Sequence, residues 1–482
     1  MSGDGSLSNE LRDRLSRRRG DDDDQSKFEV SETETYVGDT VTLTGRDLDA
    51  NEIYEVIWHS AIGSWGVLGG NEVVGPQFKP RSESIATVTT DSAGRFSEEW
   101  TVKEDYGGEH RIELRTIDGV PQARTKVTIK PWFEIDRTSA PVGETFTVTG
   151  YGLGPNMITN NYQLAWDNGM VGFMTGTLNR GTATADIRAI DEPGEHVIQV
   201  WRNLRGVPFL QNNTQSPFGP VGDERQSSWT VEVTELESEP ETTWMDSLED
   251  ETPLTAHYPE LDEATDATLE ITPTSGQPGT EATIVGREFP ADTEVDLIWY
   301  THVGNRVAGN PITPEPLPDL LPSVTTDEDG AFEIDVTIPR GMGATRPITA
   351  AVDGHEVAVT GFVMQPDIVD VSPQKGPVGT DIEIELTGIG WPTYENAYFF
   401  VYDNRPLGYV CGVDMEKHGE GIVRTIIQAT GEPGYHFIDV YPSFFETQED
   451  LPDFEQKAHL SYRENHPVRS LPALHFTFEV TE

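Results

Sequence analysis

The chain repeats one short motif four times. Each copy has a glycine, a stretch in which apolar and polar residues alternate, and a second glycine; the pairs are Gly38 and Gly45, Gly143 and Gly150, Gly279 and Gly286, and Gly379 and Gly388. Alternation of this kind is typical of a strand buried on one face, and the glycines indicate turns. A motif that recurs along the whole chain predicts several small β-domains of one kind, with no region left over for a separate catalytic domain.

The copies are also related in alternate pairs, one with three and two with four. The matched features are Trp58 with Trp299; Asp91, Gly94 and Phe96 with Asp327, Gly330 and Phe332; Trp166-Asp167-Asn168 with Tyr402-Asp403-Asn404; and Glu192-Pro193-Gly194-Glu195-His196 with Glu432-Pro433-Gly434-Tyr435-His436. The simplest interpretation is a duplicated two-domain unit, A–B followed by A′–B′.

Short apolar strands recur between turns rich in Gly, Pro, Asn and Asp, and no helical period of useful length is present. This spacing predicts an all-β chain of antiparallel β-sandwiches. The predicted segments are a flexible or docking arm over residues 1–27, domain A over 28–130, domain B over 131–235, an acidic linker over 236–267, domain A′ over 268–366 and domain B′ over 367–482.

The net charge of the chain is −50, with 83 acidic and 33 basic residues, and only eight of the basic residues are lysine. A surface this acidic repels itself in ordinary buffer, whereas molar salt shortens the Debye length to about 3 Å and screens the repulsion. Such a composition resembles that of proteins from salt-accumulating halophiles; an acidic mesophilic surface protein is the alternative. Binding to nucleic acid is not expected, because phosphate contacts need cationic surface.

The sequence has no apolar run of about 18 residues, so membrane insertion is not expected. Its N-terminal stretch lacks the apolar core of a signal peptide. Cys411 is the single cysteine, which leaves no partner for an internal disulfide and no cysteine metal cluster. We interpret Cys411 as a strand residue that packs as a small hydrophobe.

The segment Ser372–Thr380, Ser-Pro-x-x-Gly-Pro-Val-Gly-Thr, and the alternation that follows it resemble the start of an immunoglobulin-like (Ig-like) domain of the IPT/TIG type. The resemblance implies four tandem Ig-like sandwiches, arranged as the duplicated two-domain unit behind a short N-terminal arm. It also implies one buried aromatic residue per sandwich, at Trp58, Trp166, Trp299 and Tyr402. The inter-sheet disulfide of antibody domains is absent, and a fold of this kind does not by itself give a function.

No motif of an enzyme emerges from the sequence. Asp327-Glu328-Asp329-Gly330 stops too early for an EF-hand loop and predicts a β-turn. The equivalent His196 and His436 are predicted to be structural, and Asp167 and Asp403 to lie in turns. We therefore predict a protein that is not an enzyme and has no cofactor and no dedicated metal site, although weak cation binding at acidic loops stays open.

Two sets of residues are candidates for interaction. Leu7, Leu11 and Leu15 lie at helical spacing before Arg17, Arg18 and Arg19, which suits a helix that docks on a particle; a disordered tail is the alternative. The long connections 202–228 and 442–474 are candidates for recognition, since functional loops on rigid sandwiches are often long. Their aromatic residues are Phe209, Phe218, Phe444, Phe445, Phe454 and Tyr462.

The joint over residues 236–267 contains many acidic residues and no Lys or Arg, which favours an extended, solvated linker. Its apolar residues favour a second interpretation, in which the joint is strapped onto a neighbouring domain. These residues are Trp244, Met245, Leu248, Leu254, Tyr258 and Leu261.

The layout is similar to that of the decoration proteins and spikes of tailed viruses. This resemblance implies a non-enzymatic virion protein, a capsid turret, decoration or tail spike, of a virus that infects a halophilic archaeon. Its partners would be other virion proteins, copies of itself and a host-surface glycan or protein, and it would be made in the cytoplasm and found in the virion. A haloarchaeal cell-surface adhesion protein and an accessory protein of a carbohydrate-active enzyme or peptidase are the alternatives.

Overall fold

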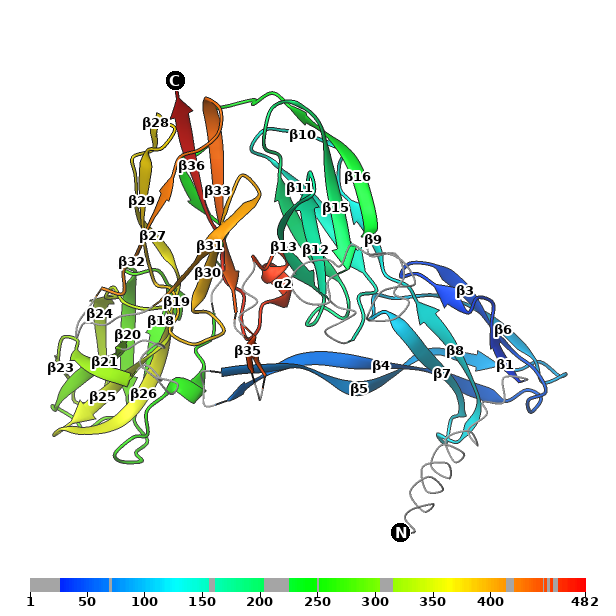
Figure 1. Cartoon of the computed structure of the whole chain (residues 1–482). Coiled ribbons are helices and arrows are strands. Elements are labelled where there is room, and N and C mark those ends of the chain that lie inside the picture. The colour runs from blue at the N-terminus through cyan, green and yellow to red at the C-terminus, as the bar shows by residue number, and fades with distance from the viewer. Residues whose placement is uncertain are drawn as a thin grey trace, which may run out of the picture.

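The computed structural model describes residues 27–68, 72–155, 161–202, 225–248, 251–303, 315–412, 420–444, 446–448, 451–453 and 458–482. These residues are almost entirely β, and eight of their sheets come in four pairs of one three-stranded and one larger sheet (Figure 1). The prediction of an all-β chain of tandem Ig-like sandwiches is confirmed, whereas the domain boundaries stay predictions. We call the four pairs of sheets A, B, A′ and B′.

Sandwiches A and B follow one another along the first half of the chain. The small sheet of A has the order β1 (Phe28–Val30), β3 (Thr40–Gly45), β6 (Phe96–Thr101), and its large sheet β2 (Glu34–Thr35), β8 (Pro121–Ile129), β7 (Gly108–Thr116), β4 (Ile53–Leu68), β5 (Glu72–Thr89). The small sheet of B has the order β14 (Ala183–Arg188), β11 (Thr145–Tyr151), β9 (Trp132–Ile135), and its large sheet β10 (Ser139–Pro141), β16 (Arg225–Thr234), β15 (Gly194–Arg202), β12 (Asn161–Trp166), β13 (Gly169–Thr175).

Sandwich A′ repeats the plan of A. Its small sheet has the order β18 (Thr268–Thr272), β20 (Glu281–Arg287), β24 (Phe332–Thr337). Its large sheet has the order β19 (Ser275–Gly276), β26 (His355–Met364), β25 (Ala344–Val352), β21 (Glu294–Val303), β22 (Glu315–Leu320), with β23 (Val324–Thr325) paired to β21.

Sandwich B′ repeats the plan of B and adds a strand from the joint. Its small sheet has the order β27 (Asp367–Ser372), β29 (Asp381–Thr387), β32 (Val423–Gln428), and its large sheet β17 (Thr243–Met245), β36 (Leu474–Thr481), β33 (Gly434–Ser443), β30 (Ala397–Tyr402), β31 (Arg405–Cys411), with β28 (Lys375–Pro377) on β36. The remaining elements are the hairpin β34 (Glu446–Gln448) and β35 (Leu451–Asp453), the turn of 3₁₀ helix η1 (Thr255–His257), and the short helix α2 (Tyr462–Asn465).

The structure explains the repeated motif. The short strand before each motif glycine pairs in parallel with the last strand of its sandwich, as in β2 with β8 and β28 with β36. The chain must then turn sharply into the next strand, and the first glycine of each motif has φ between 87° and 93°, which favours a residue without a side chain. The predicted aromatic residue is buried in each sandwich, at Trp58, Trp166, Trp299 and Tyr402.

The junction between A and B is repeated between A′ and B′. The Gly107 amide donates to the carbonyl of Leu153 at 3.1 Å, and its counterpart Gly343 donates to Ile389 at 2.8 Å. A Cβ at either glycine would lie about 2 Å from the carbonyl oxygen of Gly152 or Gly388. The close approach of two backbones therefore requires glycine at both positions, and the duplication extends to the contact between domains.

The joint is strapped onto A′ and B′ rather than solvated. Its strand β17 adds to the large sheet of B′ next to β36. The Leu254 amide donates to Thr345 Oγ1 at 2.9 Å, and the Tyr258 ring lies where a Cβ of Gly361 would be. Of the two interpretations of residues 236–267, the extended linker is therefore wrong for the described part, because apolar and backbone contacts outweigh the preference of its acids for water.

The hairpin of β4 and β5 extends far beyond sandwich A and crosses beneath B toward B′ (Figure 1). Trp65 near its end packs edge-on against Phe444, with ring centroids 5.2 Å apart. Val73 lies in the same buried cluster as Tyr394 and Phe444. The hairpin thus ties A to the far half of the chain.

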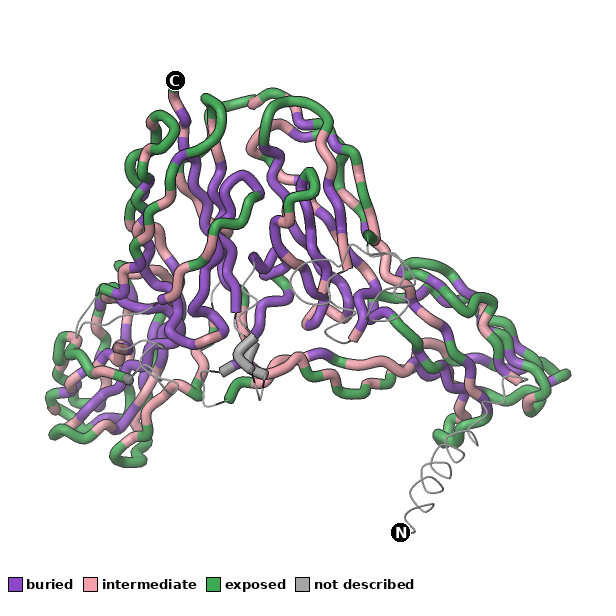
Figure 2. Tube along the Cα trace, in the orientation of Figure 1, coloured by how far each residue is buried: buried purple, intermediate pink, exposed green. Residues whose placement is uncertain are grey.

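The central strands of the large B′ sheet, β30 and most of β33, are buried on both faces. Along β30, Tyr398 and Phe400 point into the core of B′, whereas the alternating Phe399 and Val401 belong to the core cluster of B. Figure 2 shows the facing strands of B and B′ buried over much of their length. Because side chains alternate between the faces of a strand, this burial joins B and B′ through one continuous core.

We expect B and B′ to unfold together. The change Phe437→Ala removes a ring from β33 that packs in the core cluster of B, and the expected loss is about 3–5 kcal/mol of unfolding free energy. Hydrogen exchange followed by mass spectrometry should show lower protection in β11 and β14 of B as well as in β33. The control Ile348→Ala, in the separate core of A′, should leave B and B′ unchanged. Loss of protection confined to B′ would contradict a shared core.

Candidate functional site

The contact between B and B′ contains a buried group of charges. Arg188 of β14 reaches into B′, where its Nε donates to Asp439 Oδ2 at 2.9 Å and its Nη2 to Asp439 Oδ1. Its Nη1 donates to the Gly143 carbonyl at 2.6 Å. The guanidinium carbon lies 5.2 Å from the centroid of the Trp244 ring and 5.3 Å from that of Phe437. A planar guanidinium suits this place, because it forms a bidentate pair and stacks on aromatic rings.

His475 links this pair to the joint. Its Nδ1 lies 2.6 Å from Asp439 Oδ1 and its Nε2 lies 3.5 Å from Asp246 Oδ1, while its ring stacks on Trp244. Burial would lower the pKa of His475, but its two carboxylate partners raise it above its ordinary value. Burial would likewise raise the pKa of Asp439, yet Arg188 and His475 hold it well below its usual range. Arg188 comes from B, Asp439 and His475 come from B′, and Asp246 comes from the joint. Opposite charges therefore link these three parts of the chain in one buried group.

A segment of the B′ connection adds to the edge of B. The Phe173 amide of β13 donates to the Ala458 carbonyl at 2.9 Å, and the Leu460 amide donates to the Phe173 carbonyl at 2.7 Å. Beyond it, Asn465 Oδ1 accepts from the Leu178 amide at 2.9 Å, and Arg463 Nη1 donates to Asp186 Oδ2 at 2.6 Å. Main-chain pairing to an exposed sheet edge is a common mode of recognition between proteins.

Two glycines of B make this contact possible. A Cβ at Gly172 would lie 2.4 Å from the Ala458 carbonyl oxygen and 2.8 Å from the Leu460 side chain. A Cβ at Gly143 would lie 2.7 Å from the Phe437 ring. Sandwich B is thus shaped along one side, from its motif turn across β14 to β13, to receive B′. We call this surface the lateral side of B.

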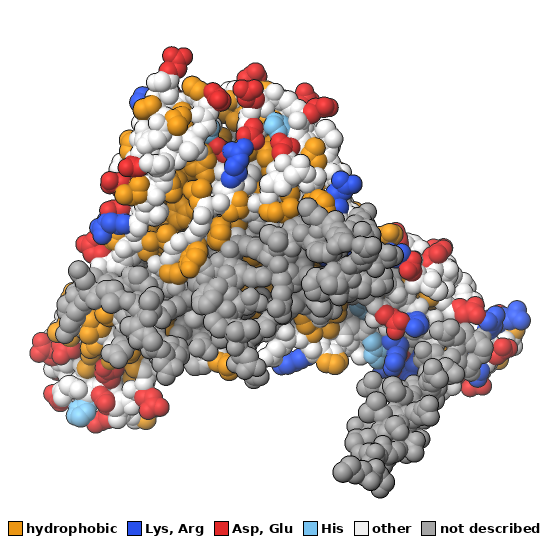
Figure 3. Space-filling model, viewed as in Figure 1, with side chains coloured by type: hydrophobic (Ala, Val, Ile, Leu, Met, Phe, Trp, Pro, Cys, Tyr) orange, Lys and Arg blue, Asp and Glu red, His pale blue; other side chains and the backbone are white. Residues whose placement is uncertain are grey.

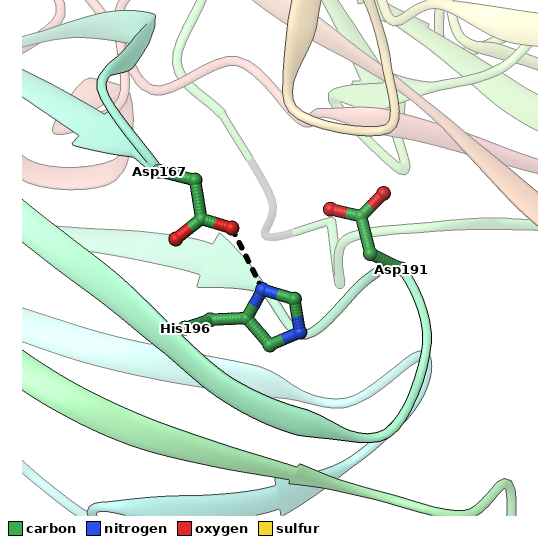
Figure 4. Close-up of side chains that lie close together, drawn as sticks. All are labelled: Asp167, Asp191 and His196. Atoms are coloured by element: carbon green, nitrogen blue, oxygen red, sulfur yellow. Dashed lines mark hydrogen bonds and ion pairs between the residues drawn. The ribbon is translucent and has the colours of Figure 1, made fainter.

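A second cluster, on the surface of B, contains Asp167, Asp191 and His196, whose potential ligand atoms all lie within 4.8 Å of one another (Figure 4). His196 Nδ1 lies 2.7 Å from Asp167 Oδ2, and its Nε2 lies 3.0 Å from the Glu192 carbonyl. Both neighbours are acceptors, so this geometry favours a ring with a proton on each nitrogen, and such a ring offers no lone pair to a metal ion. The histidine therefore fits a structural clamp, as predicted, and the cluster does not fit a metal site.

The same clamp recurs in B′. His436 Nδ1 lies 2.6 Å from Asp403 Oδ2, and its Nε2 lies 2.9 Å from the Glu432 carbonyl. Asp403 Oδ1 also accepts from the Phe437 amide at 3.0 Å. Burial would lower the pKa of both histidines, but the bonds to carboxylate and carbonyl raise the pKa above its ordinary value in each. In both sandwiches the imidazole joins the Asp-Asn turn to the Glu-Pro-Gly turn, and protonation of the ring strengthens this tie.

The predicted turn at Asp327 is confirmed. Asp327 Oδ1 accepts from the amides of Asp329 and Ala331, and the Gly330 amide donates to the Asp327 carbonyl at 3.0 Å. Asp91 makes the equivalent bonds in A. One carboxylate oxygen of each aspartate, Oδ1, is thus engaged by two backbone amides of its own turn.

A cleft of about 580 Å³ lies between the joint and the B′ connection. Its charged residues are all engaged: Asp246 accepts from the Tyr462 hydroxyl, Glu251 Oε1 lies 3.0 Å from Arg469 Nη1, and Arg463 is bound to Asp186. Each of these charged side chains is thus held by an ion pair or a hydrogen bond within the chain.

The structure places few of the interaction residues predicted from the sequence. Leu7, Leu11, Leu15, Arg17, Arg18 and Arg19 lie outside the described residues, as do Phe209, Phe218, Phe445 and Phe454. Phe444 and Tyr462 are described, and here the expected exposure is wrong, because both rings are buried. Phe444 packs against the β4–β5 hairpin and Tyr462 against B, so the B′ connection uses them within the chain.

The residues that build the B–B′ contact were missed by sequence reasoning. Arg188, Asp439 and His475 are far apart in the sequence, and no local pattern relates them. One signal was present: Gly172 and Gly408 match in the two halves, inside strands where glycine is otherwise unfavourable. Cys411 lies in strand β31, as predicted, and it is half-buried there.

Comparisons with known proteins identify similar solved structures. No family model matches the sequence, and no curated protein matches it. The solved structures that it resembles include a tetra-tandem repeat from the extending region of a large adhesion protein (10% identity, TM-score 0.18, covering 94% of this chain and 99% of that one). Salmonella alpha-2-macroglobulin reacted with methylamine is similar at 10% identity with a TM-score of 0.18. The match covers 93% of this chain and 30% of that one, so this chain spans about a third of that protein's length. An ICAM-5 ectodomain fragment is similar at 13% identity with a TM-score of 0.17, and the match covers 88% of this chain and 96% of the fragment.

At these TM-scores the similarities carry no argument about fold, activity or partners. Among the residues that the structure describes, no helix has the length and apolar character needed to cross a membrane.

The change Arg188→Met tests the buried pair. It leaves Asp439 buried with His475 as its remaining partner, and we expect a loss of about 3 kcal/mol of unfolding free energy in denaturant titrations. The double change Arg188→Met with Asp439→Leu should recover most of the loss, because an apolar pair of similar volume needs no charge compensation. A single variant as stable as the wild type would show that the pair does not hold B to B′.

The clamp predicts a dependence of stability on pH. Because the pKa of His436 is raised on folding, its contribution is fully present below the ordinary histidine pKa of about 6.5 and is lost as the pH rises through the raised value. The variant Asp403→Asn should therefore be less stable than the wild type by about 1–3 kcal/mol at pH 6, and the difference should shrink by pH 9. Thermal unfolding across this range measures it; a difference that grows with pH would reverse the proposed sign.

Proposed function

We propose that this protein is a non-catalytic structural protein whose Ig-like sandwiches form one stiff body. The observation that carries the proposal is the pair of central strands β30 and β33 of the large B′ sheet, which are buried on both faces and join B to B′ through a shared core. Domains on flexible linkers move relative to one another, whereas domains joined by a large apolar interface are held in place. The strapped joint and the long A hairpin add to the same stiffness.

More specifically, we propose a component of a tailed virus of a halophilic archaeon, as a capsid turret, decoration or tail spike. The acidic composition and the resemblance of the tandem layout support this assignment. Its partners would be other virion proteins, copies of itself and a host-surface glycan or protein, and its place would be the virion. The proposal requires no cofactor. A haloarchaeal cell-surface adhesion protein remains the second candidate, because tandem Ig-like domains also suit that role.

The test is peptide mass spectrometry of density-purified particles from the source culture, with the copy number per particle. Abundant peptides at a symmetric copy number are expected. Absence from particles, with recovery in the cell-envelope fraction, would replace the virion assignment with the adhesion protein.

Deletion of residues 1–20 tests the N-terminal arm. Because these residues carry the Leu7, Leu11, Leu15 and Arg17–Arg19 pattern, we expect the deletion to abolish incorporation into particles. Circular dichroism should show the sandwiches still folded. Incorporation at the wild-type level would remove the arm from the mechanism of attachment.

A further inference from the structure

The contact between B and B′ is not symmetric, although the two sandwiches are related by duplication. Sandwich B uses its lateral side, and B′ uses the outer face of its large sheet together with the connection 458–465. A contact between two related units through different surfaces is heterologous, so it leaves one surface of each kind unused. The second surface of the receiving kind is the lateral side of B′. Its hairpin of β30 and β31 touches B at the turn, where Asn404 Nδ2 donates to the Arg188 carbonyl at 2.8 Å. The open part of this surface is therefore β31 beyond that turn, together with β32 and the turn at Val378.

In the described strands, each position on the lateral side of B′ corresponds to a position on that of B, although the residues often differ. The bulge in the pairing of β12 with β13, after Leu164, recurs between β30 and β31 after Phe400. Phe173 opposite Gln163 corresponds to Tyr409 opposite Phe399 in the same registers. Asp186 opposite Thr147 corresponds to Ile426 opposite Glu383. The two lateral sides therefore have the same backbone framework.

The two lateral sides differ in burial, because that of B is covered and that of B′ is exposed at the equivalent positions. In B, strand β13 is buried from Val171 to Thr175 except for Phe173, which is half-buried, whereas in B′ the matching Leu407 and Tyr409 are 53% and 47% exposed. Val142 packs against the shared core, but its counterpart Val378 is 60% exposed. Ile426 is 59% exposed.

These four residues, Val378, Leu407, Tyr409 and Ile426, are among the most exposed large hydrophobic side chains of the described part of the chain. Hydrophobic side chains gather over β31 and its neighbours in Figure 3. Exposed apolar surface on an edge strand is typical of an interaction site.

The space around two pairs of equivalent glycines differs between the two lateral sides in the same way. In B, a Cβ at Gly172 would collide with Ala458, and a Cβ at Gly143 would collide with the Phe437 ring. A Cβ at their counterparts in B′, Gly408 and Gly379, would meet nothing within 4 Å. Gly379 is needed for its turn, since its φ is 88°. Gly408 has no such φ and lies within strand β31. A glycine there costs strand stability, and the close approach of another backbone explains it as it does at Gly172.

We propose that the lateral side of B′, formed by the turn at Val378, strand β31 and strand β32, binds a second copy of this chain. The mode is the one that B′ uses on B within the chain. The donor in that contact is the connection between β33 and β36, and its counterpart in B is the connection between β15 and β16. The sequence of residues 203–222 in that connection has no Asp or Glu in a chain with 83, and it contains Phe209 and Phe218. A segment without acidic residues suits a surface on which Ile426 replaces Asp186.

This inference deepens the proposed function and rests on it for its biological setting, since an assembly protein must bind neighbours. The contact joins copies head to tail, so it leads to rings or open chains rather than a closed two-fold dimer. Like charges on the two copies oppose it, and molar salt removes most of that opposition.

The test is sedimentation velocity of the full-length protein in molar KCl over a range of concentrations, with wild type, Gly408→Val and Ile426→Lys. The wild type should self-associate, and either variant should raise Kd about tenfold or more. Because nothing described lies within 4 Å of the Gly408 position, that variant should keep the wild-type circular dichroism and melting temperature. Leu320→Lys, which changes an exposed leucine of A′, is the matched control and should associate as the wild type does.

A wild type that stays monomeric at every concentration, or a folded Gly408→Val that associates normally, would overturn the proposal. Capture of a different virion protein on β31 by a monomeric wild type would do the same, because the proposed occupant is a second copy. Failure of this inference is distinct from failure of the proposed function, which depends on incorporation into particles. The matched change Gly172→Val should instead lower the melting temperature of the monomer, since the Ala458 carbonyl lies against it.

Discussion

The structure depends on a β-sheet whose central strands are buried on both faces. A sandwich strand normally has one face in its own core and one in water, and its sequence alternates accordingly. In β30 of B′ every residue is buried, because Tyr398 and Phe400 fill the core of B′ while Phe399 and Val401 complete the core of B. Once this sheet is shared, the Arg188–Asp439 pair, the strapped joint and the docked connection all have a fixed frame in which to form.

The buried charges define where the shared core closes. A charge pair inside a protein contributes little net stability compared with an apolar pair, but breaking it is costly. Arg188 therefore does more to set how B lies on B′ than to strengthen the contact. The clamps at His196 and His436 have a more local role: each holds two turns together within its own sandwich, and each histidine is committed to a carboxylate and a carbonyl. Their recurrence shows that the duplication preserved internal ties while the contact between units stayed asymmetric.

Much of the fold could be predicted from the sequence, because its determinants are local. The motif glycines, the Asp-x-x-Gly turns and the buried aromatic residue depend on backbone geometry and alternation within a few residues. The contacts between sandwiches depend on residues hundreds of positions apart. Acidic composition suggested a solvated joint. In the structure the Leu254 amide bonds to Thr345 of A′, its side chain packs against the cluster of Val73, Tyr394 and Phe444, and Tyr258 lies against Gly361 of A′. Phe444 and Tyr462 were expected on the surface for a similar reason: their connection is long, and only the fold shows that it packs against A and B.

The sequence by itself determined the class of fold, the duplication of a two-domain unit and the acidic surface, since each is written in local patterns or composition. Only the tertiary structure decided that the units are fused and that the contact is one-sided. Gly172 and Gly408 occupy equivalent positions in the two repeats, yet a Cβ at Gly172 would meet Ala458 whereas a Cβ at Gly408 would meet nothing within 4 Å. The physical reason is that packing between distant segments depends on which surfaces meet in space, and two copies of one sequence pattern need not meet the same neighbour.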